Sequence, residues 1–488
     1  MKNVLSKKRL KLYIINLMAL IPLICFICPH YSVVSYGLAN NYAQHIKDFL
    51  GSMRFFGAFI IKCWTSVFDP ISNPCIDLII YIIFTSIIIS TFSLFLQNKF
   101  TMKSNRELVL LDVSVLISFS NIWINNILTF PECIFLLSIG NVLCCLSLVF
   151  FFIEDKRKIW HIVLSSIFLV LSTAIYQQYL VIFIIYSIII VSVCVLQNNA
   201  TKKETFFDYI RLGIFCVLSE IIYYFLGRLI QIIWNIHPNS RIDISVDGII
   251  NRIKYFVIHQ HSFLKGRGFF QTEVLTIGFG IVFIVWIIAI VFYTKNKKQY
   301  FKFGLITLSY IVGYSSSFLL GLLSTSTGIR TMLGLFSVFG LFSIGSVALL
   351  KKKTICSCLN VVLVLVFILN ISKTVEMSVA QYQTNTIELT YANLYLSEIN
   401  QHELNHAKIE KIEICTDASC DTIQKTENAL SYSGYFRGLM FYVSGRNYEV
   451  SEMSDNQYLK VFSETDWKYF VPSKQMIYSG DTLYLCIY

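Results

Sequence analysis

Four ionisable residues fall within or beside long apolar runs, where a charged side chain needs an explanation. They are Asp112, Glu132, Glu220 and Arg228. A charge in hydrocarbon costs about 2.5–3.5 kcal/mol on insertion scales, so such residues usually face a cavity or a partner. Glu220 and Arg228 are eight residues apart, about two helical turns, and therefore share a face. The sequence leaves a structural pairing and a substrate cavity both open.

Arginine in the polar segments indicates binding of an anion. Arg330 stands in the hydroxyl-rich segment 324–331, and its planar fork suits a phosphate because it makes two charge-assisted hydrogen bonds. Anchoring to a lipid head group is an equal alternative. The basic residues of segment 234–270 could attract an anionic lipid-linked substrate.

The elements that must position these residues are membrane spans. Of the 488 residues, 55% are hydrophobic and 14% charged, with a mean hydropathy of +0.63. Water cannot cover so much apolar surface with so little charge, which argues against a soluble, disordered or fibrous protein. A span needs about 20 mainly apolar residues. Eleven segments qualify: 12–29, 76–96, 108–123, 133–153, 160–175, 179–196, 209–233, 272–293, 303–323, 332–350 and 355–371.

The basic residues orient these spans. With the N-terminus in the cytosol, the inner segments hold 19 Lys and Arg residues, whereas the outer segments hold 8. Positively charged loops are retained inside, so this asymmetry predicts a multi-pass membrane protein with a cytoplasmic N-terminus. An odd number of spans places the C-terminus on the extracytoplasmic side. Because the basic clusters are short and lie between apolar runs, no nucleic-acid partner is expected.

The C-terminal part differs from the rest of the chain. Residues 1–372 carry a net charge of +17 and residues 373–488 a net charge of −6. A helical stretch over Val375–Gln401 precedes β-type runs at Lys411–Cys415, Phe441–Val450 and Thr482–Tyr488. We therefore predict an all-α polytopic membrane domain of about 11 transmembrane helices over 1–372 and a small extracytoplasmic α+β domain over 373–488. Cys415 and Cys420 could form a disulfide there.

Several short motifs occur in an order that resembles a known family. The motifs are the polar pair Asn40-Asn41, Arg54-Phe55-Phe56-Gly57, Asp69-Pro70-Ile71-Ser72 before the second span, Glu132 at the start of the fourth span, and Tyr176-Gln177 inside a hydrophobic hairpin. In this order, over most of residues 10–350, the chain resembles the polytopic glucosyltransferases that modify bacterial O-antigen, the type II glucosyl transferase family.

The resemblance implies a fold, a reaction and a set of partners. It implies a GT-C-type enzyme that takes a sugar, with glucose expected, from a polyprenyl-phosphate carrier and passes it to a lipid-linked or surface glycan such as O-antigen. Membrane lipid is a further partner; no cofactor is implied, and a metal is optional because arginine can hold the phosphate. The implied substrate-binding residues are Asn40, Asn41, Arg54, Tyr176 and Gln177, and the residue chemistry described above adds Arg330.

The first polar segment departs from the family at a position that matters for catalysis. The family usually carries an Asp-Asp pair where this chain has Asn40 and Asn41. An amide cannot take the proton of an acceptor hydroxyl, whereas a carboxylate within hydrogen-bond reach can. Either Asp48 or Glu132 then replaces the pair as the catalytic acid/base group, or transferase activity has been lost. We favour Glu132, because it opens a span on the outer side near the first segment.

Two other functions fit the same sequence. An O-antigen or capsule polymerase also has ten or more spans and basic outer loops, and segment 234–270 would then be central. A catalytically degenerate homologue that binds glycan would explain Asn40 and Asn41. A cytosolic nucleotide-sugar enzyme is disfavoured, because the chain has no Gly-rich phosphate loop.

Overall fold

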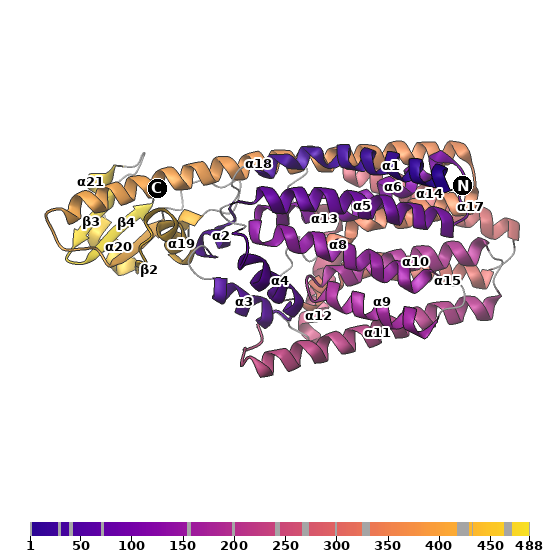
Figure 1. The fold of residues 1–488 in the computed structure, drawn as a ribbon, viewed down its shortest axis with the longest axis horizontal. Coiled ribbons are helices and arrows are strands. Elements are labelled where there is room, and N and C mark those ends of the chain that lie inside the picture. The colour runs from indigo at the N-terminus through magenta and orange to yellow at the C-terminus, as the bar shows by residue number, and fades with distance from the viewer. Residues whose placement is uncertain are drawn as a thin grey trace.

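The protein consists of a long helical bundle with a small domain at one end (Figure 1). The computed structural model describes residues 2–27, 31–38, 42–69, 73–153, 158–197, 201–239, 245–265, 273–297, 300–324, 332–416, 429–431, 433–462 and 471–487. The N-terminus lies at the far end of the bundle and the C-terminus lies in the small domain (Figure 1). We refer to the end of the bundle that carries the small domain as the domain end.

All eleven segments predicted as spans contain helix. The long bundle elements are α1 (Lys2–Leu20) with η1 (Ile21–Ile27), α5 (Cys75–Lys99), α6 (Asn105–Phe119), α8 (Pro131–Phe152), α9 (Ile159–Thr173), α10 (Gln178–Gln197), α11 (Lys202–Ile233), α14 (Val274–Lys297), α15 (Tyr300–Ser316), α17 (Ser337–Leu350) and α18 (Lys353–Glu403). Within the described residues, nine helices are long and apolar enough to cross a membrane.

Of the eleven predicted transmembrane helices, nine are therefore supported. The segments 160–175 and 303–323 are the exceptions, because α9 has 15 residues and α15 has 17. Helix α9 nevertheless runs along the bundle (Figure 1), and it packs against α8. The Ser147 hydroxyl of α8 donates to the Ser165 carbonyl of α9 at 2.8 Å, and the Ser165 hydroxyl donates to the Ser147 carbonyl at the same distance.

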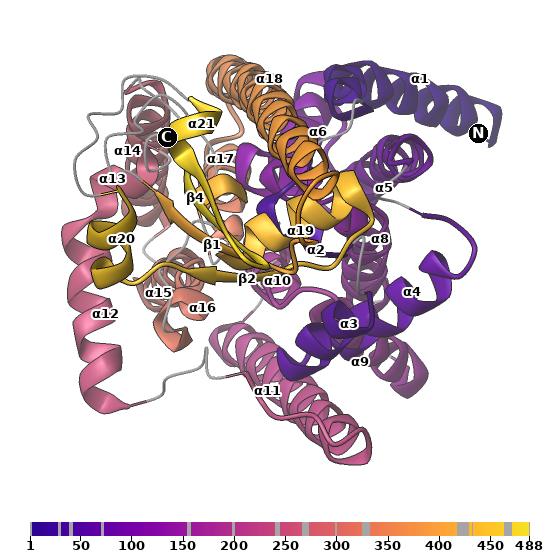
Figure 2. The ribbon, with the colours of Figure 1, turned by 90° about the vertical axis from the view of Figure 1, so that its left-hand side faces the viewer.

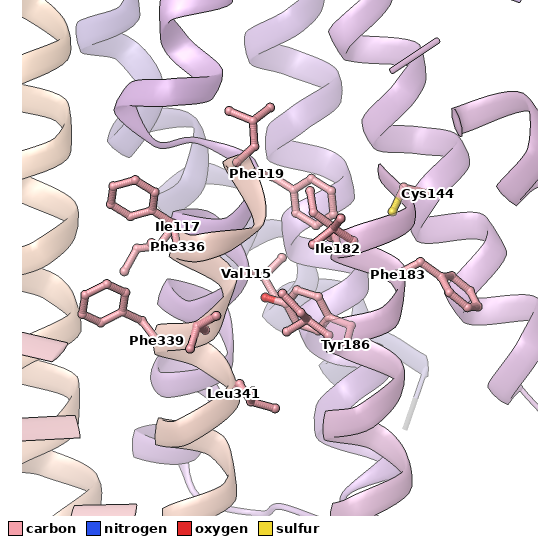
Figure 3. Close-up of a cluster of buried hydrophobic side chains, with 14 of the residues drawn as sticks. Val115, Ile117, Phe119, Cys144, Ile182, Phe183, Tyr186, Phe336, Phe339 and Leu341 are labelled. Atoms are coloured by element: carbon pink, nitrogen blue, oxygen red, sulfur yellow. The ribbon is translucent and has the colours of Figure 1, made fainter. Parts of the chain in front are cut away.

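The bundle core is packed by large apolar side chains from α6, α8, α10 and α17 (Figure 3). Tyr186 of α10 lies fully buried among them. Its hydroxyl donates to the Ser114 carbonyl at 3.1 Å and lies 2.9 Å from the Ser118 hydroxyl. A buried phenol needs such partners, because an unpaired hydroxyl in an apolar core is costly. The core therefore has one fixed arrangement of α6 against α10.

Helix starts follow signals that are visible in the sequence. Ser104 and Glu107 form a capping box at the start of α6, and Thr201 and Glu204 form another at the start of α11. Each pair satisfies backbone donors that the first turn leaves open. Pro131 occupies the first position of α8, which suits its fixed φ and missing N–H. This start places Glu132 in the first turn of α8, at the domain end.

Short helices cover the domain end of the bundle. They are α2 (Val33–Leu38), α3 (Tyr42–Gly51), α4 (Phe55–Thr65), α7 (Ile122–Asn125), η2 (Asn126–Thr129), α12 (Val246–Ile258), α13 (Gln260–Leu264), α16 (Leu319–Leu323) and η5 (Leu333–Phe336). Seen from the small domain, α2 lies under the domain, α3 and α4 lie to one side, and α12 lies at another edge (Figure 2).

The small domain is built around the end of α18. This helix has 51 residues and continues from the bundle into the domain. The predicted boundary after residue 372 falls inside it and stays a prediction. The domain's other elements are β1 (Lys411–Thr416), η7 (Ala429–Ser431), α19 (Ser433–Ser444), β2 (Glu449–Glu452), α20 (Asp455–Phe462), α21 (Pro472–Gln475), β3 (Met476–Ser479) and β4 (Thr482–Ile487). The four strands form a sheet of order β2-β1-β4-β3, with β1 parallel to β2 and β4, and β3 antiparallel to β4.

The strand predictions for this domain are partly wrong. The predicted runs at 411–415 and 482–488 correspond to β1 and β4, but the predicted run at 441–450 is mostly helix and loop, with the strand β2 beginning only at Glu449. Buried Leu439 and Met440 belong to helix α19, and a short apolar run does not distinguish a buried strand from a buried helix. Cys420 lies outside the described residues, so the predicted disulfide stays a prediction.

Helix α2 joins the first polar segment to the small domain. The backbone N–H of Tyr31 donates to the Asn385 amide oxygen at 2.9 Å, and the Tyr36 hydroxyl donates to Glu388 at 3.0 Å. Burial, and then the charge of Glu388, raise the pKa of Tyr36 above its usual value, so this phenol stays a donor. A Cβ on Gly438 of α19 would lie 2.6 Å from the Gly37 backbone nitrogen. Helices α2 and α19 therefore touch backbone to backbone.

Substitution of Gly438 by alanine tests this contact. Gly438→Ala must push α2 away from α19, because the added methyl meets backbone atoms that cannot rotate aside. Overpacking of this kind typically costs about 1–3 kcal/mol, so we expect a clearly lower midpoint of thermal unfolding for the purified protein in detergent. Gly434→Ala is the matched control on α19, since nothing lies within 4 Å of its Cβ position. An equal midpoint for both variants would contradict the close contact.

Candidate functional site

The structure describes five of the eight residues that the sequence analysis assigned to the site. Asn40, Asn41 and Arg330 lie outside the described residues. Asp48 lies on the exposed side of α3, where it accepts a hydrogen bond of 3.1 Å from the Gln44 side chain. The other four, which are Arg54, Tyr176, Gln177 and Glu132, are found at the domain end. Three of them meet directly.

Arg54 lies just before α4 and is held by the turn between α9 and α10. Its Nε donates to the Gln177 side-chain oxygen at 3.3 Å. Its guanidinium carbon lies 4.8 Å from the ring centre of Tyr176 and 5.7 Å from that of Phe49. Among the described residues, the two terminal amino groups of Arg54 make no hydrogen bond or ion pair. The side chain is thus fixed through one edge, and the other edge is available to an anion.

Gln177 connects three segments of the chain. Its amide nitrogen donates to the Ser52 carbonyl at 2.9 Å and to the Tyr223 hydroxyl of α11 at 3.0 Å. Its oxygen accepts from Arg54. A side-chain amide can serve as donor and acceptor at once, which explains why glutamine suits this position. The result is a cluster of neutral polar and aromatic groups around one cation, which we call the Arg54 cluster.

Glu132 occupies a second, buried position of the same region. Its side chain is 4% exposed, and one carboxylate oxygen accepts a hydrogen bond of 3.1 Å from the Ser35 hydroxyl of α2. The side chains of His45 from α3 and Cys133 from α8 lie beside it, with one ligand atom from each of the three residues within 4.8 Å of the others. This group of a carboxylate, an imidazole and a thiol is the second part of the candidate site.

Phe49 places the two parts next to each other. Its ring centre lies 4.7 Å from that of His45, and the guanidinium of Arg54 lies over the same ring. Burial, and then the positive charge of Arg54, lower the pKa of His45 to about 4. His45 is therefore neutral near pH 7. The Glu132 carboxylate of α8, the neutral His45 imidazole of α3 and the Arg54 guanidinium before α4 thus lie in one region, with the Phe49 ring between the last two.

Four functional candidates escaped the sequence analysis. They are His45, Ser35, Cys133 and Tyr223. Cys133 follows Glu132 in the sequence, whereas each of the other three meets a predicted site residue from a different part of the chain. The signal that could have found His45 is its position on the amphipathic helix α3, where it shares a buried face with Phe49. Contacts between helices far apart in the sequence carry no comparable signal in a single chain.

The arrangement supports two chemical operations. A buried carboxylate can take a proton from a bound hydroxyl. An arginine with two available amino groups can stabilise an anionic leaving group such as a phosphate. Together, a bundle of helices that are long and apolar enough to cross a membrane, with these groups at one end next to a small domain, fits the class of membrane proteins.

The chain belongs to the family of glucosyl transferases described as Glucosyl transferase GtrII. The profile of this family matches residues 23–344, which is about two thirds of the chain. The match includes Glu132, Arg54 and the Tyr176-Gln177 pair and ends before α18 enters the small domain. The family resemblance seen in the sequence is thereby confirmed. No curated protein matches the chain.

A double-mutant cycle tests the role of Gln177 in the Arg54 cluster. Gln177→Leu leaves the Ser52 carbonyl and the Tyr223 hydroxyl without the partner they have now. A buried polar group left without its hydrogen-bond partner typically lowers the free energy of unfolding by about 1–3 kcal/mol, so we expect a lower midpoint of thermal unfolding. Tyr223→Phe should lower the midpoint in the native background and have much less effect in the Gln177→Leu background, because the bond is already lost. Additive effects of the two substitutions would exclude the hydrogen bond.

Proposed function

We propose that the protein transfers glucose from a polyprenyl-phosphate carrier to a lipid-linked or surface glycan, such as O-antigen, on the extracytoplasmic side of the inner membrane. Membership of the glucosyl transferase family supports the transfer of glucose. The observation that carries the carrier assignment is Arg54, whose terminal amino groups have no partner among the described residues while Gln177 and Tyr176 hold the rest of the side chain.

In the proposed reaction, each group of the site has one task. A glycan hydroxyl attacks the anomeric carbon of the carrier-bound glucose, and the new C–O bond forms as the bond from that carbon to the phosphate oxygen breaks. The hydroxyl proton goes to the carboxylate of Glu132. The polyprenyl phosphate leaves with the bonding electron pair, and Arg54 stabilises its negative charge. Tyr176 offers an aromatic surface beside Arg54.

Glu132 is a better candidate for the acid/base group than Asp48. Glu132 is buried, and the His45 and Phe49 rings lie between it and the Arg54 guanidinium, whereas Asp48 is exposed and engaged by Gln44. A carboxylate that is shielded from water can exchange a proton with one bound hydroxyl rather than with solvent. We therefore assign the acid/base role to Glu132, and the roles of Asn40, Asn41 and Arg330 stay predictions from the sequence.

Substitution of Glu132 tests the assignment. Glu132→Gln keeps the size of the side chain and can still accept the Ser35 hydrogen bond, but it cannot take a proton. Acid/base groups contribute typically about 10²–10⁴-fold, so we expect a loss of glucose transfer of at least about 100-fold. The measurement is transfer from polyprenyl-phosphate glucose to the glycan by the purified protein, together with the mass and linkage of the surface glycan in cells.

Asp48→Asn is the matched control, because it removes the same charge from an exposed position of α3. It should transfer glucose at nearly the native rate. Full activity of Glu132→Gln with loss in Asp48→Asn would reverse the assignment. In a deletion strain, loss of chain length instead of a side-branch glucose would identify a polymerase. Activity that appears only after Asn40 and Asn41 are both changed to Asp would identify a degenerate homologue.

The proposed reaction requires the site and the small domain to lie outside the cytosol. A reporter that is active only outside the cytosol, fused after Tyr488, should be active, and a reporter that is active only in the cytosol should be inactive at that position. The same pair of reporters fused after Lys353, at the far end of α18, should give the opposite result. Cytosolic activity after Tyr488 would rule out the extracytoplasmic reaction.

A further inference from the structure

Three metal-binding side chains from two helices meet in the buried part of the site. One ligand atom each from His45, Glu132 and Cys133 lies within 4.8 Å of the others. In a tetrahedral zinc site with bonds of about 2.0–2.3 Å, ligand atoms are about 3.3–3.8 Å apart. Small side-chain rotations would close this difference. We propose that His45, Glu132 and Cys133 bind a divalent zinc-type cation.

The donor set selects the class of cation. An imidazole nitrogen, a carboxylate oxygen and a thiolate sulfur are the three ligand types of zinc sites, whereas magnesium and calcium prefer oxygen alone. A carboxylate and a thiolate together carry two negative charges, so a divalent cation makes the cluster neutral. Neutrality matters here because Glu132 is 4% exposed at the end of an apolar bundle, where uncompensated charge is costly.

The surroundings of His45 suit it to bind a cation. The side chain is 8% exposed and its ring packs on Phe49. Its Nε2 is buried and has no hydrogen-bond partner among the described residues. Buried polar atoms are nearly always paired, so this imidazole nitrogen beside a carboxylate and a thiol points to a ligand-binding role. A cation bound by the three side chains supplies that partner.

The carboxylate has the supporting contact that metal sites usually show. Ser35 donates to one oxygen of Glu132 at 3.1 Å, and the other oxygen can face the cation. Outer hydrogen bonds of this kind orient a ligand and typically change metal affinity by about 10–100-fold. Three protein ligands leave the fourth position of a tetrahedral cation for solvent or a substrate oxygen. Cation binding goes beyond the proposed function and is compatible with it, because a cation on one oxygen of Glu132 leaves the oxygen beside Ser35 to take the hydroxyl proton. It is measured without donor or acceptor.

The experiment uses the full-length protein, purified in detergent without a histidine tag and titrated with Zn²⁺ and Co²⁺. We expect one tightly bound Zn²⁺ per chain. Bound Co²⁺ should show a thiolate-to-cobalt charge-transfer absorption and the intense visible bands of tetrahedral coordination. Cys133→Ser should abolish the charge-transfer absorption, and His45→Ala should weaken Zn²⁺ binding by at least about 100-fold, because each removes one of three protein ligands.

Two further variants separate the site from general effects. Cys63→Ser on α4 is the matched control, because Cys63 is an exposed thiol outside the cluster, and it should keep both the stoichiometry and the charge-transfer absorption. Ser35→Ala should keep the absorption and weaken Zn²⁺ binding by about 10–100-fold. An absorption that persists in Cys133→Ser, or disappears in Cys63→Ser, would overturn the proposal. So would a native protein that retains no Zn²⁺ after dialysis while it stays monodisperse.

Discussion

One buried carboxylate fixes the arrangement at the domain end of the molecule. Glu388 is 0% exposed and accepts hydrogen bonds from the Tyr36 hydroxyl, the Asn385 amide and the Ala429 backbone N–H. These donors come from α2, α18 and the small domain. A buried carboxylate is tolerated only where such donors surround it, so the three segments must meet at this point. Because α18 is one continuous helix, this contact also fixes the small domain relative to the bundle.

The same segment sets the environment of the candidate acid/base group. Ser35 is the residue before Tyr36, and its hydroxyl reaches Glu132, while the Ser32 backbone N–H donates to the Thr129 carbonyl at 3.0 Å. Segment 31–38 is thus hydrogen-bonded on one side to the small domain and on the other to the start of α8. A displacement of the small domain would move Ser35 and change the contact with the carboxylate. The small domain therefore helps to position Ser35 beside Glu132.

The sequence predicts the parts of this molecule that depend on local pattern. Apolar length locates the helices, and the motif order locates Arg54 and Tyr176-Gln177, which the fold brings together although 122 residues separate Arg54 from Tyr176. The sequence does not predict contacts between segments. His45 lies beside Glu132 because of the way α3 lies against α8, and the 3.6-residue period of one helix does not indicate which helix packs against it. The short strand β3 and the helix α19 were missed because packing in the small domain decides them.

The partners of Arg54 give a physical reason for the choice of residues around it. An arginine paired with a carboxylate has its charge neutralised, and an anionic substrate would have to break that pair. Gln177, Tyr176 and Phe49 hold the guanidinium without any negative charge. Orientation is therefore secured while the full positive charge stays available, and side chains next to apolar helices screen it less than water would. The negative charge of the region is instead kept on Glu132, on the far side of the His45 and Phe49 rings.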